Sequence, residues 1–168
     1  MKTTGLIVMG VAGSGKTTVG KALATRLGWD FFDADEFHPP GNVAKMAAGI
    51  PLTDADRAPW LAGLHDLLAQ TLRSGRHPVL ACSALKRSYR TTLLQGNDGI
   101  GIIYLKGSYE LILSRMTDRS DHYMKPGMLR SQFETLEEPV DALTVEVNPP
   151  PEEIVEFLYQ TLIGKEGG

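Results

Sequence analysis

The sequence predicts an α/β fold in which a five-stranded parallel sheet carries helices on both faces. Short apolar runs alternate with segments of helical periodicity, and no two of the runs are joined by a hairpin turn. This alternation is typical of a parallel sheet that is covered on both sides. The chain has 168 residues, 42% of them hydrophobic, which suits one compact domain with its own core. We therefore expect a single domain over residues 1–168.

The expected strands and helices follow one another along the chain. The strands are the apolar runs at residues 6–9, 29–32, 78–81, 100–105 and 143–147. Helices are expected at residues 15–27, 43–48, 86–94, 109–119 and 128–136, and after Pro151. A longer helix carries leucines at helical spacing over 61–72, with Pro59 in its first turn and Arg57 at its mouth. The polar segment 118–127 is expected to be a mobile lid within the domain.

Charge and cysteine content exclude several classes of protein. The 17 Lys and Arg residues stand against 20 Asp and Glu residues, and a net charge of -3 provides no basic surface for nucleic acid. Cys82 is the single cysteine, so no disulfide can close within the chain, as in proteins of a reducing compartment. No run approaches the roughly 18 apolar residues of a membrane span. We expect a cytoplasmic protein that binds neither nucleic acid nor membranes.

A phosphate-binding loop follows the first expected strand. The residues GVAGSGKT at 10–17 match the pattern G-x-x-x-x-G-K-[ST] between a strand and a helix, where the motif belongs. Its backbone N–H groups and the helix dipole attract phosphate. Lys16 is expected to reach the β- and γ-phosphates of ATP, and the Thr17 hydroxyl to bind Mg²⁺. The residues expected to bind the nucleotide are Gly10, Val11, Ala12, Gly13, Ser14, Gly15, Lys16, Thr17 and Thr18.

Two aspartates follow the second expected strand, at the edge of the sheet where α/β proteins bind ligands. The chain has no Asn-Lys-x-Asp tetrapeptide of a GTP switch, and the third strand, VLACS at 79–83, has no aspartate for a metal. We therefore expect Asp33 on the Mg²⁺ side. Asp35 is expected to orient the acceptor hydroxyl and to take its proton. The alternative is a pair of solvated turn carboxylates.

Further motifs accompany the loop and the aspartates, namely HP at 38–39, PLTD at 51–54, DRAPWL at 56–61, CSALK at 82–86, HYM at 122–124 and SQFETLE at 131–137. Together they resemble the thermoresistant gluconokinases, which are related to shikimate and nucleoside monophosphate kinases. The resemblance implies a P-loop NTPase fold of the nucleoside monophosphate kinase type, with three α/β/α layers. It also implies the conversion of ATP and D-gluconate into ADP and 6-phosphogluconate with Mg²⁺, and a homodimer. Tyr123, where phenylalanine is expected, is a mild departure.

A gluconate site must hold one carboxylate and a row of hydroxyls. Arg57 is the first choice for pairing with the carboxylate, the alternative being a surface arginine paired with a neighbouring aspartate. Lys86 and Arg90 lie four residues apart, which predicts one helix face with a charge suited to carboxylate or phosphate. A solvated basic face is the alternative. His38 is expected to bind sugar hydroxyls, or else to be an ordinary loop residue.

Two arginines border the expected lid. Arg115 and Arg119 are also four residues apart, and we expect both to act in catalysis by covering the γ-phosphate during transfer. An exposed helix end, paired with nearby aspartates, is the alternative.

Other functions stay open on the sequence alone, because many kinds of protein share a phosphate-binding loop. The acceptor could instead be another small hydroxy acid such as shikimate, or a nucleoside monophosphate. A non-catalytic nucleotide-binding regulator is the alternative from another class.

Overall fold

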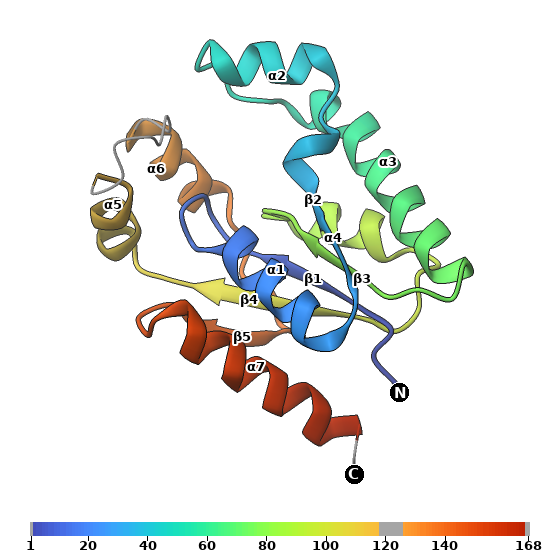
Figure 1. Ribbon diagram of the computed structural model, residues 1–168. Helices are drawn as coiled ribbons and strands as arrows, with labels where there is room; N and C mark the ends of the chain where they lie inside the picture. Colours follow the sequence, from blue (N-terminus) through green and yellow to red (C-terminus); the bar gives the residue numbers. More distant parts are fainter. Residues whose placement is uncertain (1, 118–125, 167–168) are drawn as a thin grey trace.

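The computed structural model describes residues 2–117 and 126–166, and in these residues five parallel strands form one sheet between two layers of helices (Figure 1). The order across the sheet is β2-β3-β1-β4-β5. The predicted fold class is therefore confirmed, and each strand end lies within one residue of its expected position. The strands are β1 (Gly5–Met9), β2 (Asp30–Asp33), β3 (Pro78–Ala81), β4 (Ile100–Lys106) and β5 (Leu143–Glu146).

The helices alternate with the strands as expected. Residues 118–125 of the expected lid, with Arg119, lie outside the described residues, and residues 126–127 begin a helix. Within the described ranges, no helix is long and apolar enough to cross a membrane. The helices are α1 (Lys16–Leu27), the short 3-10 helix η1 (Ala34–Phe37), α2 (Pro40–Ala47), α3 (Asp54–Arg73), α4 (Arg87–Leu94), α5 (Tyr109–Thr117), α6 (Pro126–Thr135) and α7 (Pro151–Glu166).

Helix α3 begins earlier than predicted. The Thr53 hydroxyl accepts the Asp56 N–H at 3.1 Å, and the Asp56 carboxylate accepts the Thr53 N–H at 2.9 Å. This capping box starts the helix at Asp54, so Pro59 lies in the second turn and not in the first. The expected position of Pro59 was wrong because the Thr-x-x-Asp pattern of the cap was missed. Arg57 closes the first turn by donating its N–H to the Thr53 carbonyl at 3.1 Å.

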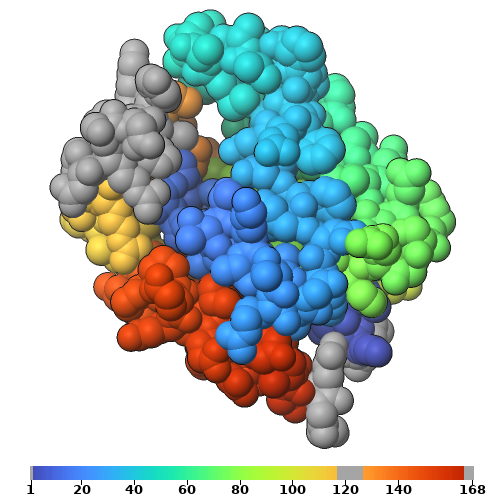
Figure 2. Space-filling model, viewed as in Figure 1, coloured from blue at the N-terminus to red at the C-terminus, as the bar shows by residue number. Residues whose placement is uncertain are grey.

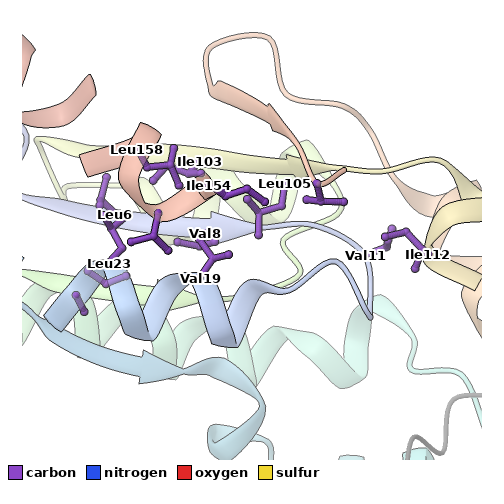
Figure 3. Close-up of a cluster of buried hydrophobic side chains, with 14 of the residues drawn as sticks. Leu6, Val8, Val11, Val19, Leu23, Ile103, Leu105, Ile112, Ile154 and Leu158 are labelled. Carbon is purple, nitrogen blue, oxygen red and sulfur yellow. The ribbon is translucent and has the colours of Figure 1, made fainter. Parts of the chain in front are cut away.

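The central strand β1 is buried on both faces. Leu6 and Val8 belong to the core on one side of the sheet, and Ile7 and Met9 to the core on the other side. All four side chains are at most 1% exposed, which explains the uninterrupted apolar run. Helices α3 and α4 cover the second face. On the first face, α1 and α7 supply the side chains of Val19, Leu23, Ile154 and Leu158 (Figure 3).

Candidate active site

The phosphate-binding loop connects the carboxyl end of β1 to α1 at the centre of the sheet. Gly13 and Gly15 have φ angles of 79° and 98°, a region that glycine adopts without strain. Gly15 is the N-cap of α1, and no side chain in the described ranges caps this helix end. The first amides of α1 are therefore free to bind an anion, and the helix dipole favours negative charge there.

Two amides of the loop are engaged inside the protein. The Ser14 N–H donates to the Val11 carbonyl at 3.2 Å. The Ala12 N–H donates to Oε1 of Gln132, a residue of α6, at 2.7 Å. Sequence reasoning did not single out Gln132, although it belongs to the SQFETLE motif. These two amides are thus held by a local bond within the loop and by a long-range bond to α6.

Lys16 lies near the acidic segment, which comprises residues 33–35 at the end of β2 and the start of η1. Its Nζ donates to the Val11 carbonyl at 3.0 Å. Burial lowers the pKa of the Lys16 ammonium, while the carboxylates of Asp35 and Asp33 act in the opposite direction. A partly dehydrated cation therefore lies within electrostatic reach of both aspartates, where it can attract phosphate strongly.

Asp33 joins the acidic segment to the phosphate-binding loop. Its Oδ2 accepts the Thr17 hydroxyl at 3.0 Å, and its Oδ1 accepts the Asp35 N–H at 3.0 Å. The two side chains expected on the metal side are thus in direct contact. Hydroxyl and carboxylate oxygens are ligands that Mg²⁺ prefers, and the ion usually takes only one or two of them from the protein when it binds with a nucleotide. In residues 2–117 and 126–166 there is no cluster of three or more His, Cys, Asp or Glu that could hold a metal.

The segment from η1 to α2 brings further polar groups to this edge. The His38 ring stacks on Trp60 at 4.1 Å, and its Nδ1 lies 3.2 Å from the Asn42 side-chain nitrogen. Burial lowers the pKa of His38, the Asp35 charge raises it, and the Arg57 charge lowers it. His38 is therefore neutral near pH 7, and it lies close to both of the charged residues expected to bind the acceptor.

Trp60, a buried residue of α3, bonds the backbone of the acidic segment. Its side chain is 5% exposed, and its indole N–H donates to the Ala34 carbonyl at 2.8 Å. Ala34 separates Asp33 from Asp35 and is completely buried. Trp60 was missed as a site residue, although it lies in the DRAPWL motif. The hydrogen bond from the indole to Ala34 thus ties the segment that carries both aspartates to α3.

Arg57 and Lys86 meet in one polar cluster at the start of α3. Arg57 donates through Nη1 to the Leu52 carbonyl at 2.8 Å and to the Tyr89 hydroxyl at 3.2 Å. Lys86 bonds the Asp54 carboxylate at 3.0 Å, and the Tyr89 hydroxyl donates to the same carboxylate at 2.5 Å. These bonds from Tyr89 and Lys86 lower the pKa of Asp54, and the bond to Asp54 raises the pKa of Lys86. The two cations are close, and Asp54 partly balances their charge.

Arg90 lies elsewhere than expected. Its side chain is 6% exposed, and it donates to the carbonyls of Ala84 at 2.7 Å, Leu85 at 3.2 Å and Glu137 at 2.8 Å. The Arg90 backbone N–H donates to the Lys86 carbonyl at 3.2 Å, so both residues lie in the first turn of α4, but the Lys86 side chain bonds Asp54 whereas the Arg90 side chain bonds these main-chain carbonyls. Arg90 therefore ties the loop before α4 to Glu137, and a role in binding a ligand stays a prediction.

Arg115 points toward the end of the last strand. Its Nη2 donates to the Val147 carbonyl at 2.5 Å and to the Asn148 carbonyl at 3.5 Å. This contact ties α5 to the segment between β5 and α7. A catalytic role for Arg115 stays a prediction, and Arg119 lies outside the described residues.

The surface above these residues is hollowed. Figure 2 shows a recess between the blue phosphate-loop region and the cyan helix α2, with α6 in orange on its far side. The phosphate-loop region and α2 thus border the same recess.

Comparison with known proteins agrees with this arrangement. The protein-family model for shikimate kinase matches residues 12–161. The chain is 50% identical over 141 residues to a gluconokinase of Gluconobacter oxydans (strain 621H), covering 84% of this chain and 79% of that protein. It is 44% identical over 153 residues to the thermoresistant gluconokinase of Escherichia coli (strain K12), covering 89% and 87%. The crystal structure of a gluconokinase from Sinorhizobium meliloti 1021 is 43% identical and superposes with a TM-score of 0.87 over 97% of this chain and 94% of that one.

Both kinds of similarity extend over most of the chain, from the phosphate-binding loop to α7. They include the segments that bring Thr17, Asp33 and Arg57 to one edge of the sheet. The chain therefore belongs to the gluconokinase family and carries a kinase domain of the shikimate kinase type.

Proposed function

We propose that this protein transfers the γ-phosphate of ATP to a hydroxyl of D-gluconate and releases ADP and 6-phospho-D-gluconate. The observation that carries this proposal is the 3.0 Å contact between the Thr17 hydroxyl and the Asp33 carboxylate. It joins the acidic segment of β2 and η1 to the phosphate-binding loop, so a nucleotide and an acceptor can be held side by side. The gluconokinases among the relatives support gluconate as that acceptor.

The nucleotide side consists of the loop, Lys16, Thr17 and Asp33. Amides at the start of α1 and the Lys16 ammonium hold the phosphate oxygens. The Thr17 hydroxyl and the Asp33 carboxylate would hold Mg²⁺, which neutralises charge on the β- and γ-phosphates when it is bound. Because Lys16 is partly dehydrated, its interaction with phosphate is stronger than it would be in water.

Asp35 lies on the acceptor side, two residues beyond Asp33. Its carboxylate accepts the hydrogen bond of the gluconate hydroxyl, aims the oxygen at the γ-phosphate and takes the proton as the new bond forms. The transition state of phosphoryl transfer is loose, so this residue acts mainly through positioning. Neutral His38, held against Trp60, donates or accepts hydrogen bonds with the sugar hydroxyls.

Arg57 is the proposed partner of the gluconate carboxylate. Among the described residues, only Nη1 of its guanidinium has hydrogen-bond partners. Nε and Nη2 therefore remain for a carboxylate, which matches this edge of the guanidinium with two parallel bonds. Lys86 adds positive charge nearby, and Asp54 keeps its ammonium in place. Arg90 is left out of this set because its bonds are to main-chain carbonyls.

Several expectations stay predictions within this proposal. They are the single domain over 1–168, a lid over 118–127 with Arg115 and Arg119 acting on the γ-phosphate, the cytoplasmic location and the homodimer. Closure of such a lid would exclude water and suppress hydrolysis of ATP.

An ADP-release assay with purified protein tests the proposed function. D-gluconate, shikimate, a nucleoside monophosphate and buffer are supplied in parallel with ATP and Mg²⁺. We expect ADP above the buffer level with gluconate, and none with the variant Lys16→Ala. If gluconate matched buffer while shikimate or the nucleotide supported ADP release, the acceptor would be wrong. ATP binding without turnover on any acceptor would instead favour a nucleotide-binding regulator.

A further inference from the structure

The uncharged side chain of Gln132, a residue of α6, hydrogen-bonds the phosphate-binding loop. Gln132 accepts the Ala12 N–H on its Oε1 at 2.7 Å, across 120 residues of sequence. A carboxylate could accept the same bond, but it would place a negative charge beside a loop that binds a polyanion. A glutamine therefore combines the required acceptor with the absence of charge.

The neighbouring residue of the loop, Gly13, lies close to helix α5. A Cβ atom at Gly13 would lie 3.0 Å from Met116 and 3.2 Å from Ile112, both residues of α5. Ile112 lies beside Val11, near the start of the loop (Figure 3). Ala12 thus bonds α6 and Gly13 lies against α5, so two helices contact this part of the loop.

Helix α6 is itself fixed at its carboxyl end. The Glu137 N–H donates to the Leu85 carbonyl at 2.8 Å, and its carboxylate accepts the Arg87 N–H at 2.7 Å. Arg90 donates to the Glu137 carbonyl at 2.8 Å. These bonds attach the end of α6 to the loop before α4. Gln132 therefore reaches the phosphate-binding loop from a rigid support.

We propose that Gln132 is a positioning residue for ATP, which fixes the Ala12 amide and so keeps the other loop amides aimed at the phosphates. Because α6 is anchored at its carboxyl end, the hydrogen bond from the Ala12 N–H to Gln132 keeps the loop in one conformation. A side chain on a mobile segment would lose this bond when phosphate binds. Without it, the Ala12 amide is unpaired and the loop must be ordered by the nucleotide itself. This inference rests on the proposed use of ATP and adds a residue to its phosphate site.

Two variants of Gln132 test the inference in the full-length protein. Gln132→Met keeps the length and removes the acceptor, and a hydrogen bond of ordinary strength predicts binding of a non-hydrolysable ATP analogue that is weaker by about three- to tenfold. The Michaelis constant for gluconate should change by less than about twofold, because a defect confined to the phosphate site leaves acceptor binding intact. Gln132→Glu keeps the acceptor but adds charge, so it should bind the analogue more weakly than Gln132→Met at low salt, with the difference shrinking at high salt.

Gln160→Met serves as the matched control, because Gln160 is an exposed glutamine of α7 that bonds only Glu156 among the described residues. Unchanged or tighter analogue binding in Gln132→Met would overturn the inference, as would equal losses for ATP and gluconate. Gln132→Glu with wild-type affinity at low salt would also overturn it. Thermal melts check that each variant is folded. A wild type that binds the analogue but does not phosphorylate gluconate would contradict the proposed function and not this inference.

Discussion

Replacing Trp60 by phenylalanine tests whether the core of α3 sets the position of the two aspartates. The substitution keeps an aromatic ring against His38 but removes the indole N–H that donates to the Ala34 carbonyl at 2.8 Å. Ala34 is completely buried, so water cannot replace the lost donor. An unpaired buried carbonyl costs about 1–3 kcal/mol, and the smaller ring adds a cavity cost of the same sign. We therefore expect the free energy of unfolding to fall by at least about 1 kcal/mol.

The same substitution should lower turnover, because Ala34 lies between Asp33 and Asp35 in the chain. A shift of about 1 Å in a positioned group can cost on the order of 100-fold, so we expect kcat to fall by about ten- to 100-fold. Urea unfolding followed by circular dichroism measures stability, and the ADP-release assay measures kcat. Trp29→Phe is the control, since Trp29 stacks on His77 and lies at the amino end of β2, away from the aspartates. A Trp60→Phe protein with stability and kcat close to wild type would refute this reasoning.

Three further predictions concern single side chains. Arg57→Leu should raise the Michaelis constant for gluconate more than that for ATP, and equal increases would contradict the proposed carboxylate partner. Hydrogen bonds from Thr53 and Lys45 lower the pKa of Asp56 to about 2. The ionised Asp56 carboxylate therefore contributes fully to the free energy of unfolding above its ordinary pKa of 3.8, and this contribution is lost as the pH falls toward 2. Urea unfolding across this pH range should show a smaller loss of stability in Asp56→Asn than in wild type. Burial raises the pKa of the Cys82 thiol to about 12, so a thiol reagent at pH 8 should label it only after unfolding, and rapid native labelling would contradict the buried position.

The fold and the position of the phosphate-binding loop between β1 and α1 could be predicted because their signals are local. Burial on both faces produces the apolar run of β1, and the loop motif identifies Lys16 and Thr17 directly. Thr17 and Asp33 were both expected on the metal side, since the parallel strands β1 and β2 end at the same edge of the sheet, but their direct hydrogen bond was not predicted. These inferences need only the spacing of apolar residues along the chain and the direction of its strands.

The remaining contacts depend on distant parts of the chain and left no local signal. Gln132 reaches Ala12 across 120 residues, and the indole of Trp60 reaches Ala34 across 26. The burial of the Arg90 side chain could not be predicted, because a spacing of four residues does not say whether solvent or main-chain carbonyls surround a side chain. The sequence alone does not distinguish a buried arginine that donates its hydrogen bonds to main-chain carbonyls from an exposed arginine that binds a ligand.

The most direct test of the proposed mechanism is the turnover of Asp35→Asn, measured together with its affinity for a non-hydrolysable ATP analogue. The amide is close in shape to the carboxylate but cannot take the proton of the acceptor hydroxyl. If Asp35 orients and deprotonates gluconate, kcat should fall by about 100- to 10,000-fold while the affinity for the analogue changes by less than about twofold. A kcat within a few-fold of wild type would contradict the account, since the acceptor hydroxyl would then be activated by another group.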